Sequence, residues 1–186
     1  MNVVYQFGTL KVCRLEEKDK LLLAKWLSTP AVLEFYEGRD NSFDVEKVER
    51  VFYSSDDDEV KCIIEYEGNL IGYIQYYELD EATKKEYGYE SGRIFGTDQF
   101  IGEVDYWNRG IGTLLVTSMT EFLFTQMKAD KVVMDPQVWN ERAIKCYEKC
   151  GFKKVKLLPK HELHEGELRD CLTLEKCSGN PEHFSL

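Results

Sequence analysis

The sequence predicts a mixed α/β (α+β) domain in which helices cover the faces of a central β-sheet. Segments in which apolar and polar residues alternate are interspersed with segments in which apolar residues recur at helical spacing. The 186 residues, of which 43% are hydrophobic, are enough to bury one sizeable core. We therefore expect a single domain over residues 1–177, followed by a flexible tail over residues 178–186.

The first part of the chain predicts one strand and two helical segments. Residues 10–15 alternate as a strand does, and apolar residues at helical spacing follow Asp19 over residues 21–27. Pro30 is expected to end this helix, because proline cannot continue a helix from its interior. Apolar residues over 32–36 indicate a short further turn.

The middle of the chain predicts a helix and then a β-hairpin. Asp44 is a typical capping residue, here for a helix that continues to residue 52. The β-rich runs 60–66 and 70–79 are joined by the turn sequence Glu67-Gly68-Asn69. Polar residues then indicate a loop or a short helix over 80–92.

A strand, a long helix and a buried strand are expected next. Residues 93–101 have a strand pattern, and Gly96 and Gly102 indicate either a bulge or a close approach of the backbone to a neighbour. Apolar residues at helical spacing cover 110–128, and a short apolar run follows at 131–134.

The last part predicts one capped helix and two strands. Asn140 is expected to cap a helix that Gly151 ends. Residues 152–158 and 171–174 are expected to be strands, with a polar loop over 159–170 between them.

Charge and hydropathy restrict the class of partner. The chain has 24 basic and 34 acidic residues, a formal charge of −10. This excess of acid argues against a nucleic-acid or anionic-membrane surface and slightly favours a cationic small molecule, although solubility alone explains it equally well. No segment approaches the roughly 20 apolar residues that span a bilayer, and no apolar signal core follows residues 1–5. We expect a cytoplasmic protein.

The cysteine and histidine spacings predict no metal site. The six cysteines form no CxxC pair and are expected to be reduced thiols in the core. Cys146 and Cys150 are four residues apart, but a structural zinc would need two further ligands. In His161-Glu162-Leu163-His164 one residue separates the glutamate from the second histidine, whereas the zinc-protease pattern HExxH requires two.

Residues 107–113, Trp-Asn-Arg-Gly-Ile-Gly-Thr, predict an anion-binding turn at the start of a helix. Glycines let the backbone turn tightly, and the N-terminus of the following helix carries unpaired N–H groups and partial positive charge. The segment lacks the GxGxxG of a dinucleotide fold and the GK[ST] of a P-loop. We therefore expect it to hold a phosphorylated cofactor other than NAD or ATP.

At this point the chain resembles the GNAT superfamily of acyl-coenzyme A-dependent N-acetyltransferases. Residues 109–112 fit the core of the family's loop [QR]xxGxG[AG], with departures at Trp107 and Thr113. Residues 140–152 resemble the family's helix Asn-x-x-Ala-xxx-Tyr-x-x-x-Gly-Phe. The resemblance implies the GNAT fold, a mixed and mostly antiparallel sheet flanked by helices, with acetyl-coenzyme A as co-substrate.

Further blocks, at 26–27, 32–40, 71–73, 96–102, 134–136 and 161–166, are similar to aminoglycoside 6'-N-acetyltransferases, especially to the acetyltransferase half of the bifunctional acetyltransferase-phosphotransferase. The resemblance implies antibiotic resistance by direct acetyl transfer to the 6'-amine within a ternary complex. The implied acceptors are aminoglycosides such as kanamycin, tobramycin and gentamicin.

The resemblance also implies where acetyl-coenzyme A binds. The cofactor would lie where the strand ending near Ile101 separates from the strand ending near Asp135. Asn140 would bind the pantetheine arm, and the Tyr147 hydroxyl would stabilise or protonate the departing thiolate. A tyrosine packed in the core is the alternative for Tyr147. The backbone N–H groups that would hold the pyrophosphate are those of Arg109, Gly110, Ile111, Gly112 and Thr113.

An acceptor with several ammonium groups needs carboxylates in its site. Asp98 matches the family's catalytic aspartate, and Asp98 and Asp135 are expected at the ends of neighbouring strands. Asp98 either takes the proton of the amine or fixes the direction of the amine while water takes the proton, because an ordinary aspartate pKa of about 3.9 makes a poor base. Further candidates for acceptor binding are Trp26, Tyr36, Glu37, Asp40 and Glu165. Trp26 is equally a core residue.

Two other functions remain open at the level of sequence. An enzyme with the same fold could acetylate another amine, such as a polyamine or a protein N-terminus. Alternatively, the chain could bind coenzyme A as a sensor without catalysis. Both Asp98 and Tyr147 would be unnecessary in such a sensor.

Overall fold

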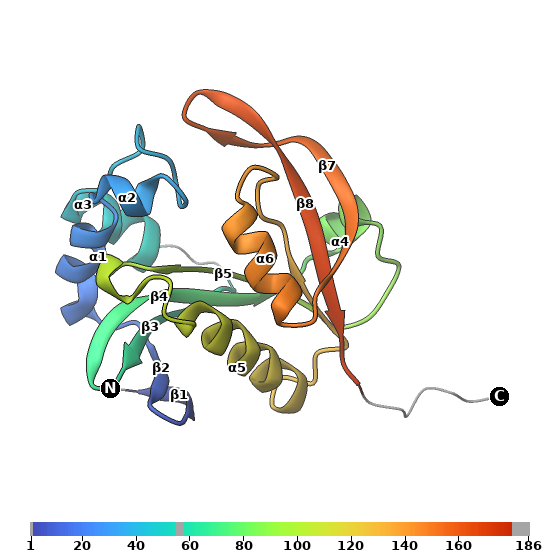
Figure 1. Cartoon of the computed structure of the whole chain (residues 1–186), viewed down its shortest axis with the longest axis horizontal. Coiled ribbons are helices and arrows are strands. Elements are labelled where there is room, and N and C mark those ends of the chain that lie inside the picture. The colour runs from blue at the N-terminus through green and yellow to red at the C-terminus, as the bar shows by residue number, and fades with distance from the viewer. Residues whose placement is uncertain (1, 55–57, 180–186) are drawn as a thin grey trace.

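An eight-stranded sheet forms the centre of the protein in the computed structural model, which describes residues 2–54 and 58–179 (Figure 1). The strands are β1 Val3–Phe7, β2 Leu10–Arg14, β3 Val60–Tyr66, β4 Asn69–Glu78, β5 Ile94–Ile101, β6 Lys131–Met134, β7 Lys153–His164 and β8 Glu167–Cys177. Their order is β1-β2-β3-β4-β5-β6-β8-β7. Only the β5–β6 pair among them is parallel, so the predicted mixed sheet is confirmed.

Helices cover both faces of this sheet. The helices are α1 Lys20–Trp26, α2 Pro30–Leu33, α3 Val45–Val48, α4 Glu81–Tyr87, α5 Ile111–Thr125 and α6 Glu141–Lys149. Successive residues of β3 point to opposite faces: Ile64 packs in the core beneath α5, and Ile63 packs in the core beneath α1 and α3. Burial of both faces explains why β3 and β4 are apolar over most of their length.

Several local predictions are confirmed. The β3–β4 hairpin forms around residues 67–68, and the Asp44 carboxylate accepts a hydrogen bond from the Lys47 N–H at 2.8 Å as the cap of α3. Gly96 and Gly102 mark close approaches of the backbone. A Cβ atom on Gly102 would lie 2.2 Å from the ring of Trp26, and β5 runs past Gly96 without a register shift.

The expected loop over 159–170 is wrong. Strands β7 and β8 form one long hairpin that turns at Glu165 and Gly166, both at positive φ (48° and 77°). Strand β7 lies at the edge of the sheet and most of its side chains are exposed, so the alternation that marks a half-buried strand is absent from its sequence. Backbone pairing with β8, rather than burial, holds β7 in place.

Two further expectations need correction near the N-terminus. Helix α1 ends at Trp26, before Pro30, and Pro30 is instead the first residue of α2, a position that needs no N–H donor. Strand β1 was not expected. Residues 180–186 of the predicted tail lie outside the described residues.

The separation of β5 from β6 creates the space for a site. Residues Ile94–Gly96 pair with Lys131–Val133, and beyond this point β5 continues beside β4 only. Residues from the first turns of α5 and α6, among them Gly112 and Ala143, line the space that this separation leaves. The expected separation of the two strands is therefore confirmed.

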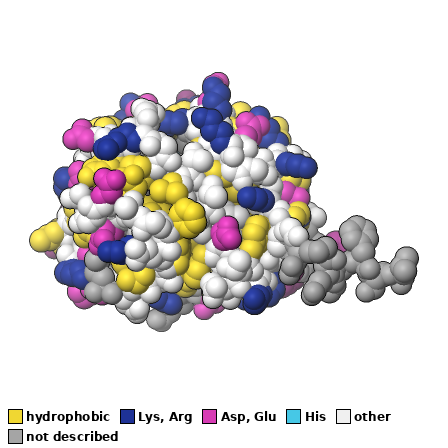
Figure 2. Space-filling view, turned by 60° about the horizontal axis from the view of Figure 1, so that its bottom comes forward, with side chains coloured by type: hydrophobic (Ala, Val, Ile, Leu, Met, Phe, Trp, Pro, Cys, Tyr) yellow, Lys and Arg dark blue, Asp and Glu magenta, His cyan; other side chains and the backbone are white. Residues whose placement is uncertain are grey.

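On the face in Figure 2, basic and acidic side chains are interspersed with hydrophobic ones. None of the helices in the described part of the chain is long and apolar enough to cross a membrane.

Candidate active site

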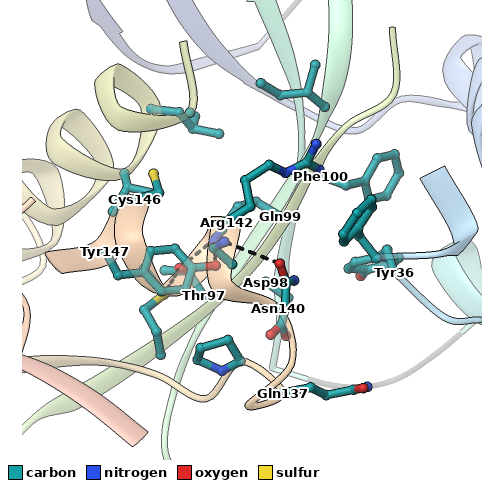
Figure 3. A pocket seen from close by; sticks show the side chains of 18 of the residues that line it. Tyr36, Thr97, Asp98, Gln99, Phe100, Gln137, Asn140, Arg142, Cys146 and Tyr147 are labelled. Atoms are coloured by element: carbon teal, nitrogen blue, oxygen red, sulfur yellow. Dashed lines mark hydrogen bonds between the residues drawn. The ribbon is translucent and has the colours of Figure 1, made fainter. Parts of the chain in front are cut away.

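A cavity of about 1010 Å³ opens where β5 leaves β6 (Figure 3). Its walls are the second half of β5, the segment that follows β6, the first turn of α5, the inner face of α6 and the end of α2. The predicted site residues Asp98, Asp135, Asn140 and Tyr147 all line it. Residues far apart in the sequence therefore meet at one site.

One end of the cavity is formed by the segment that was predicted to bind an anion, residues 107–113, which we call the cradle. Gly110 precedes α5 at φ 78°, a conformation that glycine adopts without strain, and Gly112 and Thr113 line the cavity. The first hydrogen bond along the helix runs from the Leu114 N–H to the Gly110 carbonyl, at 3.1 Å. The preceding N–H groups have no acceptor within the helix and carry the positive end of its dipole, which fits a pyrophosphate.

Trp107, which departs from the family loop, has a structural role. Its indole N–H donates to the Ile101 carbonyl at 2.8 Å and ties the cradle to the end of β5. The Arg142 guanidinium lies between the Trp107 and Phe35 rings, 4.3 and 4.2 Å from their centres. The Arg109 side chain lies over the Tyr106 ring instead, 5.1 Å from its centre.

Helix α6 brings Asn140 and Tyr147 to the cavity. The Asn140 side-chain oxygen accepts from the Ala143 N–H at 3.2 Å, which confirms the predicted cap. The Tyr147 hydroxyl accepts a hydrogen bond from Gln99 Nε2 at 2.8 Å. Burial raises the pKa of Tyr147, so its hydroxyl keeps its proton and can donate it to a third group.

Asp98 differs from the expectation in position and in acidity. It lies within β5 rather than at its end, opposite Gln75 on β4, whose Nε2 donates to Asp98 Oδ2 at 2.9 Å. Burial, and next the charge of Asp135, raise the pKa of Asp98 to about 7. A carboxylate with this pKa is a suitable base near neutral pH, whereas an ordinary aspartate is not.

Asp135 directly follows β6 and has the opposite behaviour. Although burial favours its neutral form, the nearby His161 imidazole and a hydrogen bond from Tyr87 hold the pKa of Asp135 below its ordinary value. The Tyr87 hydroxyl lies 2.6 Å from Oδ2, and His161 Nε2 lies 3.7 Å from the same atom. Of the two carboxyl groups, Asp135 therefore stays ionised, and Asp98 beside it is the weaker acid.

The remaining candidates divide into two groups. Tyr36 and Glu37 line the cavity, and burial raises the pKa of Glu37. Trp26, Asp40 and Glu165 do not line it. Trp26 is completely buried, with its indole N–H 2.9 Å from Glu103 Oε1, which makes it a core residue.

Glu165 lies at the turn of the β7–β8 hairpin. Its carboxylate accepts two hydrogen bonds from the Arg39 guanidinium, at 2.6 and 2.8 Å. This ion pair joins the hairpin to the loop after α2. Asp40, in the same loop, is exposed.

Several cavity residues were not identified from the sequence, among them Gln75, Gln99, Trp139, Arg142 and His161. His161 appeared there in a rejected zinc pattern and in the block 161–166 of the family resemblance, without a role in the site. Its position beside Asp135 depends on the β7–β8 hairpin, which the sequence analysis did not predict. Among residues 2–54 and 58–179, no three His, Cys, Asp or Glu side chains are grouped to hold a metal ion.

The His161–Asp135 pair predicts a pH-dependent contribution to stability. The Asp135 carboxylate, 3.7 Å from Nε2, raises the pKa of His161 above 6.5, and the charge of Glu86 adds to this effect. The contribution is complete below the unfolded pKa of the histidine and is lost as the pH rises through the raised value. It is lost again in acid, when the pH falls through the lowered pKa of Asp135.

We therefore expect His161→Gln to destabilise the protein more at about pH 5.5 than at about pH 8.5. Denaturant unfolding of both proteins at each pH measures the difference. An equal loss at the two pH values would contradict the ion pair.

Comparison with known proteins identifies the family of the chain. A family model described as an acetyltransferase (GNAT) domain matches residues 16–159, and the chain therefore belongs to the GNAT acetyltransferases. The expected GNAT fold, with its mostly antiparallel sheet flanked by helices, is confirmed.

Among its relatives is an aminoglycoside N(6')-acetyltransferase type 1 from Klebsiella pneumoniae, which is 29% identical over 142 residues, covering 74% of this chain and 71% of the relative.

Two solved structures have the same fold. The aminoglycoside acetyltransferase AAC(6')-Ib, in complex with coenzyme A, has a TM-score of 0.71 at 24% identity and covers 90% of this chain and 94% of its own. The spermidine N-acetyltransferase of Vibrio cholerae, in complex with coenzyme A and spermine, has a TM-score of 0.74 at 18% identity, with 92% and 96% covered. The likeness to a bifunctional enzyme stays a prediction.

Proposed function

We propose that this GNAT enzyme transfers the acetyl group of acetyl-coenzyme A to the 6'-amine of aminoglycosides such as kanamycin, tobramycin and gentamicin. The observation that carries the proposal is the pairing of Asp98, a carboxyl with a pKa of about 7, with the ionised Asp135 in a cavity next to an anion cradle. The similarity to an aminoglycoside N(6')-acetyltransferase supports the choice of acceptor.

Acetyl-coenzyme A supplies an acyl group activated as a thioester. The N–H groups of Arg109, Gly110, Ile111, Gly112 and Thr113 hold its pyrophosphate, and those at the start of α5 are the donors that the helix leaves free. Asn140 binds the pantetheine arm from the first turn of α6.

Asp98 and Tyr147 carry out the two proton transfers of the reaction. The acceptor nitrogen attacks the thioester carbonyl carbon, its proton passes to Asp98, and the carbon–sulfur bond breaks. Tyr147 donates its hydroxyl proton to the departing sulfur, because Gln99 already occupies its oxygen as a donor. Asp135 and Glu37 attract the other ammonium groups of the acceptor.

A polyamine is the second candidate acceptor. The carboxyl groups of Glu37, Asp98 and Asp135 in the cavity would attract any flexible polycation. A spermidine N-acetyltransferase also shares the fold. Aromatic residues favour the aminoglycoside, since the rings of Tyr36, Trp107 and Trp139 line the cavity and offer flat apolar surface to a sugar.

Purified enzyme should therefore release thiol from acetyl-coenzyme A in the presence of kanamycin, tobramycin or gentamicin. We expect kcat/KM for kanamycin to exceed that for spermidine by at least about tenfold. A preference for spermidine or for an N-terminal peptide would keep the acetyltransferase and replace its acceptor. Binding of coenzyme A without transfer to any amine would indicate the sensor.

A further inference from the structure

A buried hydrogen-bonded chain leads from the core to Asp98. Tyr73 and Gln75 are neighbours on one face of β4, and Gln75 pairs across the sheet with Asp98 on β5. The Tyr73 hydroxyl donates to Gln75 Oε1 at 2.5 Å, and Gln75 Nε2 donates to Asp98 Oδ2 at 2.9 Å. Tyr73 is completely buried and Gln75 is 9% exposed, so both hydrogen bonds are shielded from water.

The chain has a direction. An ionised carboxylate only accepts hydrogen bonds, so the amide nitrogen of Gln75 must face Asp98 when Asp98 is ready to take a proton. A glutamine side chain can also turn by half a rotation, which would present its oxygen to Asp98 instead. The Tyr73 hydroxyl opposes that rotation, because its proton is donated to the amide oxygen and would face the amide nitrogen, which accepts no hydrogen bond, after the turn.

We propose that Tyr73 is a positioning residue of the reaction: its hydroxyl fixes the Gln75 amide so that the nitrogen, and not the oxygen, faces Asp98. Tyr73 does not line the cavity, because Gln75 lies between its hydroxyl and Asp98, and Tyr73 touches no reacting atom. Its effect passes through Gln75, whose amide nitrogen stabilises the ionised form of Asp98 and fixes the direction of its carboxylate. This inference rests on the proposed role of Asp98.

The adjoining strand repeats the arrangement. Thr97 Oγ1 donates to Gln99 Oε1 at 2.8 Å, and Gln99 Nε2 donates to the Tyr147 hydroxyl at 2.8 Å. In both cases a buried hydroxyl holds a glutamine oxygen, and the glutamine nitrogen reaches a group assigned to proton transfer. The repetition supports a positioning role for the hydroxyl rather than an accident of packing.

The other groups that act on the Asp98 carboxyl are fixed independently of Tyr73. Asp135 and Glu59 raise the pKa of Asp98 through their charge, and the Tyr77 hydroxyl lowers it through a hydrogen bond. Asp98 in turn acts on the hydroxyls of Tyr36, Tyr73, Tyr77, Tyr87 and Tyr147. Among the described hydrogen bonds, that of the Tyr73 hydroxyl goes to Gln75, so its removal breaks the link to Gln75 and leaves the hydrogen bond between Tyr77 and Asp98 in place.

Tyr73→Phe is the test, because it removes only the hydroxyl and keeps the ring that packs on Phe100 and Phe52. Loss of the amide donor raises the pKa of Asp98, so the rising limb of the pH–rate profile should move to higher pH by about one unit. With kanamycin, kcat/KM should fall about tenfold near pH 6.5 and recover to within about threefold of the parent enzyme near pH 9.

Tyr76→Phe is the matched control. Tyr76 is a buried residue on the opposite face of β4, where its ring packs against Phe122. The Tyr76→Phe substitution is expected to leave the pH–rate profile unchanged. Gln75→Met removes the amide itself and should give the same shift, and adding Tyr73→Phe to it should cause no further shift, since both changes break one chain.

A second readout is independent of turnover. Carbon-13 NMR of labelled aspartate carboxyls follows the titration of Asp98, with Asp98→Asn to assign the signal, and the Asp98 titration should move upward in Tyr73→Phe. An unshifted titration, or a loss of kcat/KM by the same factor at every pH, would overturn the proposal. If the parent enzyme acetylates no aminoglycoside, the proposed function fails, while the carboxyl titration still decides the role of Tyr73.

Discussion

Asp98→Asn is expected to lower kcat/KM for kanamycin by about 10²–10⁴-fold, the range that a positioned proton-transfer group contributes. Asparagine has nearly the same shape but carries no charge and takes up no proton from the amine. The pKa of Asp98, raised to about 7 by burial and by Asp135, makes ionised aspartate available from neutral pH upward. Activity of the parent enzyme should therefore rise with pH through about 7. This rise should be absent from the pH–rate profile of the variant.

Thiol release measures the effect, and calorimetry with coenzyme A shows whether the cofactor end of the cavity is intact. Asp105→Asn is a matched control, since Asp105 is exposed and does not line the cavity. It should leave both quantities unchanged. Turnover by Asp98→Asn within about threefold of the parent enzyme would rule out proton transfer to this residue.

Trp26→Ala is expected to lower the free energy of unfolding by about 3–5 kcal/mol, as for other large aromatic residues removed from a core. Trp26 has no exposed surface, and its ring lies directly against the backbone of Gly102 and edge-on to Phe100. The truncation leaves a cavity and removes the indole donor to Glu103. Urea unfolding of the two proteins measures the loss.

Trp26→Phe separates a core role from a binding role. The smaller ring should recover part of the stability and leave KM for kanamycin unchanged, because Trp26 does not line the cavity. A KM raised about tenfold at unchanged stability would instead assign Trp26 to acceptor binding.

Local signals made much of the fold predictable from the sequence. Asp44 and Asn140 cap helices with their own side chains, and the Glu67-Gly68 turn joins two apolar strands, so each of these elements is encoded by adjacent residues. The anion cradle is equally local, since Gly110 and the start of α5 are contiguous. Asn140 and Tyr147 reach the cavity because they share one helix.

Features that depend on distant partners could not be predicted in this way. Strand β7 is held by pairing with β8 and has few buried side chains, so its sequence resembles a loop. The position of His161 beside Asp135 follows from that hairpin. The raised pKa of Asp98 arises from burial and from Asp135, which is distant in the sequence. Trp26 was ambiguous because an apolar helix face does not reveal what covers it.

The position of the acetyl group on the product tests the central claim most directly. The purified enzyme would be incubated with acetyl-coenzyme A and a pair of aminoglycosides that differ only in a 6'-amine or a 6'-hydroxyl, and each product analysed by NMR. We predict one acetyl group, on the 6'-nitrogen, and negligible turnover of the 6'-hydroxyl compound. Acetylation at another amine, or equal turnover of the two compounds, would contradict the proposed acceptor.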